Sequence, residues 1–254
     1  MISLMNFEYK KRLFAFNPQE ALDISLPLKN GKNNVNCYFA DEVSFDTIRM
    51  GSFVGSVAEG GPCNYQKISL SPHGNGTHTE CFGHISSESS ANLYACLKRY
   101  LFFAQLVSLP IRQVNAQSII LWEDLSERID ADFIPEALII RTLPNDLDKK
   151  TRQYSGTNPP FLDSKIGHYL AQKGILHLLV DLPSVDPEVD GGLLETHRYF
   201  WQYPDNIRSE ATISELIYVE AAIPDDFYVL NIQVTSLYTD ASPSKPILYS
   251  LKRF

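Results

Sequence analysis

Residues 161–181 read FLDSKIGHYLAQKGILHLLVD, and this stretch indicates the class of fold. In its first half, Leu162, Ile166 and Leu170 recur at helical spacing, and Gly174 follows as a stop signal. The apolar run that comes next is typical of a buried strand. Because a helix that leads directly into a buried strand is a building unit of layered domains, we predict an α/β fold.

The segments around this stretch predict further short strands and few helices. Residues 21–28 alternate as a strand does, whereas residues 1–20 are rich in aromatic side chains and predict an arm that packs on the body or on another subunit. We therefore expect a single domain at residues 21–254. Further expectations are strands at residues 35–39, 65–70, 101–109, 137–141, 228–237 and 247–251, a helix entry at 118–125, a pocket border at 51–61 and a loop at the rim of the site at 144–160.

Composition excludes several classes of partner. The chain has 254 residues, of which 44% are hydrophobic, and this is enough to bury a sizeable core. A net charge of −8 gives no electrostatic footprint for nucleic acid or an anionic membrane surface, and suits a neutral or weakly anionic small substrate. No apolar run reaches about 18 residues and no signal segment is visible, so we expect a cytoplasmic protein without a membrane span.

The four cysteines show no Cys-x-x-Cys pairing, which argues against thiolate zinc and against a disulfide framework. Cys81 is expected to be a packed thiol. Among the histidines, His168 is expected to be exposed and without a role, and His177 to be a hydrogen-bonded core residue.

Most of the candidate chemistry lies in one segment, PHGNGTHTECFGH at residues 72–84. It holds three of the six histidines and one carboxylate, and imidazole with carboxylate is the ligand set of zinc, manganese or iron(II). The glycines argue against a helix. In an extended chain, alternation points His78, Glu80 and His84 the same way, with Phe82 between them.

His73 points the other way by the same alternation. A bulge or turn at residues 74–76 would bring it back, since glycine tolerates the backbone angles that such a turn needs. His73 therefore stays an open candidate.

The segment resembles the metal-dependent cyclase family, which includes bacterial kynurenine formamidases and isatin hydrolases. The signature of that family reads His-x-Gly-Thr-His-x-Asp-x-x-x-His. Gly76-Thr77-His78 matches its middle, Glu80 stands at the place of the Asp, and His84 matches its end. The first His of the signature falls on Gly74, one position after His73.

Other segments resemble the family in the same order along the chain. Asp23-Ile24-Ser25 is similar to its opening strand, residues 181–186 to its Asp-x-x-Ser-x-Asp segment, and residues 241–245 to its Gly-Ser-Pro-x-Arg turn. By this resemblance His197 and Glu215 complete the metal site. Glu195 and Glu220 remain rivals for the acidic role.

The resemblance implies a swivelling β/β/α fold with a mixed, partly barrel-like central sheet and few helices. It implies a divalent zinc or manganese ion on His78, Glu80, His84, His197 and Glu215, with His73 as a further candidate ligand. It also implies a homodimer or homotetramer.

The activity implied is that of an arylformamidase, in which metal-bound hydroxide cleaves N-formylkynurenine to kynurenine and formate. His84 is the expected proton carrier, and Phe82 and Tyr199 are candidate substrate contacts. Two alternatives stay open: a hydrolase of a cyclic amide such as an isatin-like lactam, and a non-catalytic binding module with a degraded metal site.

Overall fold

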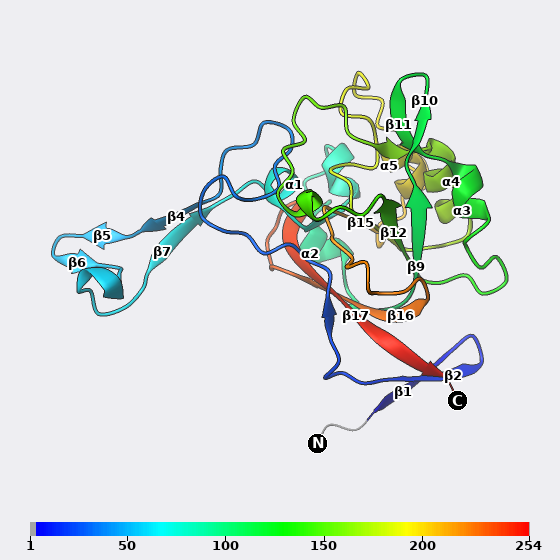
Figure 1. The fold of residues 1–254 in the computed structure, drawn as a ribbon, viewed down its shortest axis with the longest axis horizontal. Helices are drawn as coiled ribbons and strands as arrows, with labels where there is room; N and C mark the ends of the chain where they lie inside the picture. The colour runs from blue at the N-terminus through cyan, green and yellow to red at the C-terminus, as the bar shows by residue number, and fades with distance from the viewer. Residues whose placement is uncertain (1–3, 254) are drawn as a thin grey trace.

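A closed, barrel-like sheet forms the centre of the molecule in the computed structural model, which describes residues 4–253 (Figure 1). Its seven strands follow the order β17 (Ala241–Arg253), β16 (Phe227–Val234), β9 (Leu101–Pro110), β12 (Ala137–Leu143), β14 (His177–Val180), β15 (Thr212–Glu215) and β8 (His78–Cys81). β8 also pairs with β17 and so closes the ring. The predicted α/β class with a mixed, partly barrel-like sheet and few helices is confirmed.

The middle of the sheet is parallel, from β9 through β12 and β14 to β15. Parallel strands are buried on both faces, which explains why their sequences are continuous apolar runs. Leu138, Ile139 and Ile140 are fully buried, as are Leu178 and Leu179.

The predicted helix of the opening stretch is α4 (Ser164–Gln172), which follows β13 (Phe161–Leu162). The side chain of Asp163 accepts a hydrogen bond from the Lys165 amide and caps the helix, and Gly174 ends the segment with a φ of +71°. α4 packs against α5 (Glu195–Trp201) and α3 (Trp122–Ser126), and the three lie together beside the parallel strands (Figure 1).

The N-terminal arm packs on the body of its own chain. It is a hairpin of β1 (Met5–Tyr9) and β2 (Arg12–Phe16), and β2 continues the sheet by pairing with β17. Phe14 lies against Phe103 and Phe133, with ring centroids 5.1 and 6.1 Å away.

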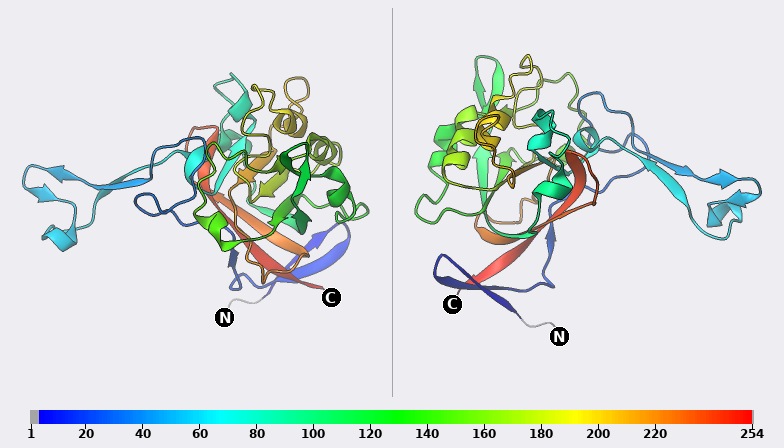
Figure 2. Two further views of the ribbon diagram at one scale, coloured as in Figure 1. Left: turned by 45° about the horizontal axis from the view of Figure 1, so that its top comes forward. Right: turned by 180° about the vertical axis from the view of Figure 1, so that it is seen from behind.

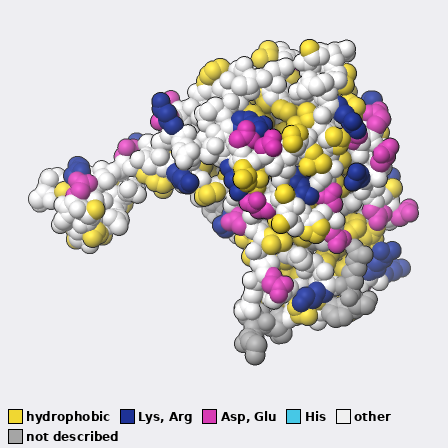
Figure 3. Space-filling view, viewed as in Figure 1, with side chains coloured by type: hydrophobic (Ala, Val, Ile, Leu, Met, Phe, Trp, Pro, Cys, Tyr) yellow, Lys and Arg dark blue, Asp and Glu magenta, His cyan; other side chains and the backbone are white. Residues whose placement is uncertain are grey.

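A second arm stands clear of the body, as Figures 1, 2 and 3 all show. It consists of the ribbons β4–β7 (Ser44–Thr47 with Gln66–Ser69) and β5–β6 (Arg49–Met50 with Phe53–Val54), followed by the 3-10 turn η1 (Val57–Glu59). Residues 51–61, which the sequence placed at the pocket border, lie at the far end of this arm instead.

Smaller elements complete the described chain. Residues 21–28 contain only β3 (Leu22–Asp23), and residues 35–39 form no strand beyond a bridge from Asn36 to Gln153. The remaining elements are α1 (Pro72–Asn75), η2 (Phe82–Ile85), α2 (Leu93–Cys96), β10 (Arg112–Val114), β11 (Gln117–Ile120) and η3 (Leu147–Lys150). Within residues 4–253, no helix has the length and apolar character needed to cross a membrane.

Candidate metal centre

β8 presents the two ligand candidates at the centre of the cluster. Alternation along this strand puts His78 and Glu80 on one face, as expected, and both side chains are fully buried. Glu215 lies directly opposite His78 in the antiparallel register with β15. Directly opposed residues share a face of the sheet, so this carboxylate joins the same cluster.

The two ring nitrogens of His78 have different surroundings, because one of them is hydrogen-bonded and the other is not. Its Nδ1 lies 2.9 Å from the Gly76 carbonyl oxygen, which requires the proton on Nδ1. In the neutral ring, Nε2 then carries a lone pair. It is buried without a hydrogen-bond partner and faces Oε2 of Glu215 at 3.4 Å. Two buried electron-rich atoms at this distance are unfavourable unless a proton or a metal ion lies between them.

Glu80 stands between two sets of imidazoles. Its Oε1 is 3.1 Å from Nε2 of His197, and its Oε2 is 3.1 Å from Nδ1 of His73 and 3.9 Å from Nδ1 of His84. Burial raises the pKa of the Glu80 carboxyl, but the charges and hydrogen bonds of these three histidines outweigh it and hold that pKa well below its usual value. Glu80 is therefore an anion in the interior.

His197 comes from the first turn of α5 and is held from behind by Asp186. One oxygen of Asp186 accepts from the backbone of Thr196 at 2.8 Å, and the other lies 2.6 Å from Nδ1 of His197. Burial alone lowers the pKa of His197, but hydrogen bonds to Asp186 and Glu80 raise it to about 10. A carboxylate behind an imidazole in this way is the usual support of a metal-binding histidine.

His73 joins the cluster through a turn of helix. The expectation of an extended segment is wrong here, because residues 72–75 form the one-turn helix α1. This turn re-aims His73 toward Glu80, while its Nε2 lies 2.9 Å from Oδ2 of Asp240. Burial lowers the pKa of His73, but its hydrogen bonds to Asp240 and Glu80 raise it to about 10.

His84 lies at the exposed edge of the cluster. It follows the strand in the 3-10 turn η2, and its side chain is 30% exposed. Its Nδ1 is 3.5 Å from Oδ2 of Asp240, and its ring centroid is 4.3 Å from that of His73. These two histidines with Asp240 form the partly exposed rim of the cluster above the buried carboxylate of Glu80.

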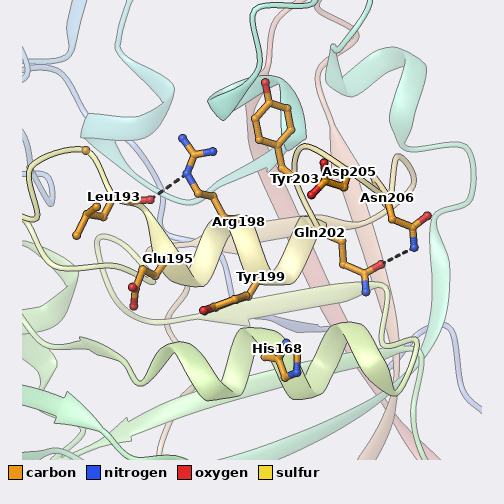
Figure 4. A pocket seen from close by; sticks show the side chains of 10 residues that line it. His168, Leu193, Glu195, Arg198, Tyr199, Gln202, Tyr203, Asp205 and Asn206 are labelled. Carbon is orange, nitrogen blue, oxygen red and sulfur yellow. Dashed lines mark hydrogen bonds between the residues drawn. The ribbon is translucent and has the colours of Figure 1, made fainter.

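The structure does not bring every predicted residue to the cluster. Phe82 packs in the main hydrophobic core and is 7% exposed. Tyr199 and Glu195 lie on the outer face of α5, opposite His197, where they line a cavity of about 740 Å³ beside His168 of α4 (Figure 4). Glu220 is exposed and pairs with Lys150.

His168 and His177 lie where the sequence predicted them. His168 is exposed on α4, and His177 is buried with its Nδ1 2.8 Å from the Thr212 hydroxyl. The cysteines at 37, 63, 81 and 96 are all free.

Two carboxylates of the cluster were missed from the sequence. Asp186 is the last residue of the segment 181–186 that resembles the family. The resemblance marks this position, but it does not indicate that the carboxylate supports a histidine. Asp240 comes immediately before the turn at residues 241–245, which gave a signal of the same kind. Neither could be placed behind a histidine without the fold.

The donor set suits a divalent transition-metal ion. Three overlapping groups each bring three ligand atoms within 4.8 Å of one another: His73, His78 and Glu80; His73, His84 and Asp240; and Glu80, His84 and His197. Imidazole and carboxylate donors are those of zinc and manganese sites. Nε2 of His78 is a buried atom without a hydrogen-bond partner, and such an ion would satisfy it.

Comparison with known proteins points to one family. The family described as "Putative cyclase" matches residues 22–187. A kynurenine formamidase of Bordetella petrii is 26% identical over 191 residues, covering 75% of this chain and 82% of the relative. A kynurenine formamidase of Bacillus cereus is 26% identical over 234 residues, covering 90% and 97% of the two chains.

Solved structures share the fold. An isatin hydrolase bound to the product analogue thioisatinate superposes with a TM-score of 0.64 at 15% identity, covering 92% of this chain and 93% of the other. A protein of Bacillus stearothermophilus described as a "predicted metal-dependent hydrolase" gives a TM-score of 0.63 at 17% identity, covering 91% of this chain and 98% of the other.

Proposed function

This chain belongs to the cyclase family, and from that membership we propose that it is a metal-dependent arylformamidase that cleaves the amide C–N bond of N-formylkynurenine to give kynurenine and formate. The observation that carries the proposal is the convergence of His78, Glu80, His197 and Glu215 in one buried cluster, in which Nε2 of His78 has no hydrogen-bond partner. The relatives that share about a quarter of its residues are kynurenine formamidases, and this supports the choice of substrate.

The buried histidines and glutamates would contribute different ligand atoms to an ion. His78 offers Nε2 because the Gly76 carbonyl fixes its tautomer, and His197 offers Nε2 because Asp186 holds its other nitrogen. Glu80 and Glu215 supply the negative charge that zinc or manganese needs. When bound, such an ion polarises a carbonyl oxygen and lowers the pKa of water to as little as ~7, which provides hydroxide at neutral pH.

His84, at the rim of the cluster, is the residue placed to transfer a proton. His84 lies close to Glu80 yet is 30% exposed, so its ring can meet a substrate atom that enters from solvent. We assign it the transfer of a proton to the leaving aryl nitrogen, a step that typically contributes 10²–10⁴-fold to the rate. His73, 27% exposed, is the remaining ligand candidate at the rim.

The test is hydrolysis by the purified protein with its metal content measured. We expect at least about one equivalent of zinc or manganese, release of kynurenine and formate, and loss of both metal and activity in His78→Ala. His84→Gln should keep the metal and lower kcat by about 10²–10⁴-fold. His168→Gln, a change on the exposed face of α4, is the matched control.

Isatin is the competing substrate in the same assay. Turnover of isatin without turnover of N-formylkynurenine would replace the arylformamidase proposal by a lactam hydrolase. Absence of bound metal after purification and after reconstitution would support the binding-module reading and refute the enzyme proposal.

We also propose a homodimer or homotetramer, supported by the second arm. A two-stranded ribbon is marginally stable alone in water, and this one exposes Met50 at 61%, Val57 at 55% and Ile68 at 58%. Light scattering on the wild type and on a variant with residues 49–64 replaced by a two-residue turn tests it. We expect an oligomer that becomes a monomer, and a monomeric wild type would refute the proposal.

For location we propose the cytoplasm, which the free thiols support because reducing compartments preserve them. Fractionation of cells that express the chain tests this, and recovery of the protein outside the cytoplasm would contradict it.

A further inference from the structure

Two carboxylate–imidazole pairs face Glu80 from its two sides. On one side Asp186 holds Nδ1 of His197 at 2.6 Å, and Nε2 of that ring lies 3.1 Å from Oε1 of Glu80. On the other side Asp240 holds Nε2 of His73 at 2.9 Å, and Nδ1 of that ring lies 3.1 Å from Oε2 of Glu80. The two arrangements match in these two contacts, with the roles of the ring nitrogens exchanged.

Packing explains why a histidine stands at position 73 instead of 74. A Cβ at Gly74 would lie 2.3 Å from the Cβ of Ala40 and 3.2 Å from the carbonyl oxygen of Cys37. The Cys37 amide also donates to the Gly74 carbonyl at 3.0 Å, which holds the two segments together. No side chain fits at position 74, so an imidazole must reach Glu80 from the neighbouring residue.

Asp240 is fixed where it can support that displaced ring. Its backbone carbonyl accepts from the Cys81 amide at 3.0 Å, and the next residue, Ala241, pairs with Glu80 in the register of β8 and β17. The backbone of Asp240 is thus tied to the strand that carries Glu80. Its side chain is 40% exposed and lies over the rim.

We propose that Asp240 is a positioning residue that makes His73 a metal ligand in place of a histidine at position 74. This inference rests on the proposed function, because it concerns the same metal centre. Asp240 orients the ring through Nε2 and so directs the Nδ1 lone pair at the ion beside Glu80. Supports of this kind typically change metal affinity by 10–100-fold.

The experiment is a double-mutant cycle read out by metal binding. Zinc dissociation constants are measured by competition with a chromophoric chelator for the wild type, Asp240→Asn, His73→Ala and the double variant. The visible absorption spectrum of each Co²⁺-loaded protein reports the ligand set directly. Asp124→Asn, which removes a surface carboxylate paired with Arg112, is the matched control.

We expect Asp240→Asn to weaken zinc binding by about 10–100-fold, to alter the cobalt spectrum, and to have less than a twofold effect once His73 is Ala. Asp124→Asn should match the wild type in both measurements. Because the Asp240 side chain is partly exposed, we expect the variant to fold, and thermal melts of the metal-free proteins confirm this.

Three results would overturn the inference while leaving the proposed function intact. The first is a zinc affinity of Asp240→Asn within twofold of the wild type. The second is an equal loss of zinc affinity on adding Asp240→Asn to the wild type and to His73→Ala. The third is a wild type that binds two ions, of which Asp240→Asn loses one. The last would mean that Asp240 binds an ion itself. A wild type that binds no ion would instead refute the proposed function, and this inference with it.

Discussion

Replacing Asp186 by Asn should weaken metal binding through the tautomer of His197. The carboxylate accepts three N–H groups: the Thr196 amide at 2.8 Å, the His197 amide at 3.2 Å and Nδ1 of His197 at 2.6 Å. An Asn side chain has only one acceptor oxygen. If its amide group faces His197, the ring must move its proton to Nε2, the atom that points at Glu80 and the ion.

The magnitude follows from these contacts. Turning the Asn the other way leaves the Thr196 amide facing a donor, and an unsatisfied buried donor costs about 1–3 kcal/mol. Either orientation therefore carries a penalty, and we expect metal affinity to fall by about 10–100-fold, or about 1.4–2.8 kcal/mol. The Asp186 side chain is 2% exposed, so solvent does not supply a substitute acceptor.

The assay compares zinc dissociation constants of the wild type, Asp186→Asn and Glu188→Gln. Glu188 is a fitting control because it also accepts two backbone amides, those of Gly156 and Asn158, neither of which belongs to a histidine. Thermal melts of the metal-free proteins separate lost affinity from lost folding. A folded Asp186→Asn protein with wild-type affinity would refute this account of His197.

Three further predictions concern the fold. Burial, with the nearby arginine charges, lowers the pKa of His177 to about 3, so between that pH and ~6.5 the unfolded chain binds more protons at this residue, and the contribution of His177 to stability should fall by about 2 kcal/mol from pH 7 to pH 5. Urea titrations of the wild type and of His177→Gln should differ by this loss, because the other titrating groups are the same in both. Lys149→Met should cost about 3–5 kcal/mol by leaving the Asp181 charge buried without its cation, whereas adding Asp181→Leu should recover only part of that loss, because the buried Thr142 amide then loses its acceptor. Gly83→Ala puts a Cβ 1.9 Å from the Ala91 carbonyl oxygen, and should lower the melting temperature together with the activity.

The sequence predicted the parts of the fold whose causes are local. α4 follows from apolar residues at helical spacing between a capping Asp163 and Gly174, and the parallel strands follow from their continuous apolar runs. The face shared by His78 and Glu80 follows from strand alternation alone.

The one-turn helix α1 depended on distant contacts. Its glycine would ordinarily weaken a helix, but Asn75 accepts from the Ser71 amide at 2.6 Å and donates to the Asp41 carbonyl at 3.0 Å. The Cys37 amide makes a third contact to α1 by donating to the Gly74 carbonyl at 3.0 Å. Such contacts cannot be read from residues 72–75, and neither could the pairing of His73 with Asp240, 167 residues later in the chain.

The position of β8 between β15 and β17 has a consequence for biosynthesis. A ribosome releases residues 78–84 early, but both strands that hydrogen-bond to β8 emerge only after residue 211. The nascent chain therefore carries His78 and His84 unassembled until both of these strands have been made, and contacts this far apart close slowly. The proposed metal site can form only once β15 and β17 have paired with β8.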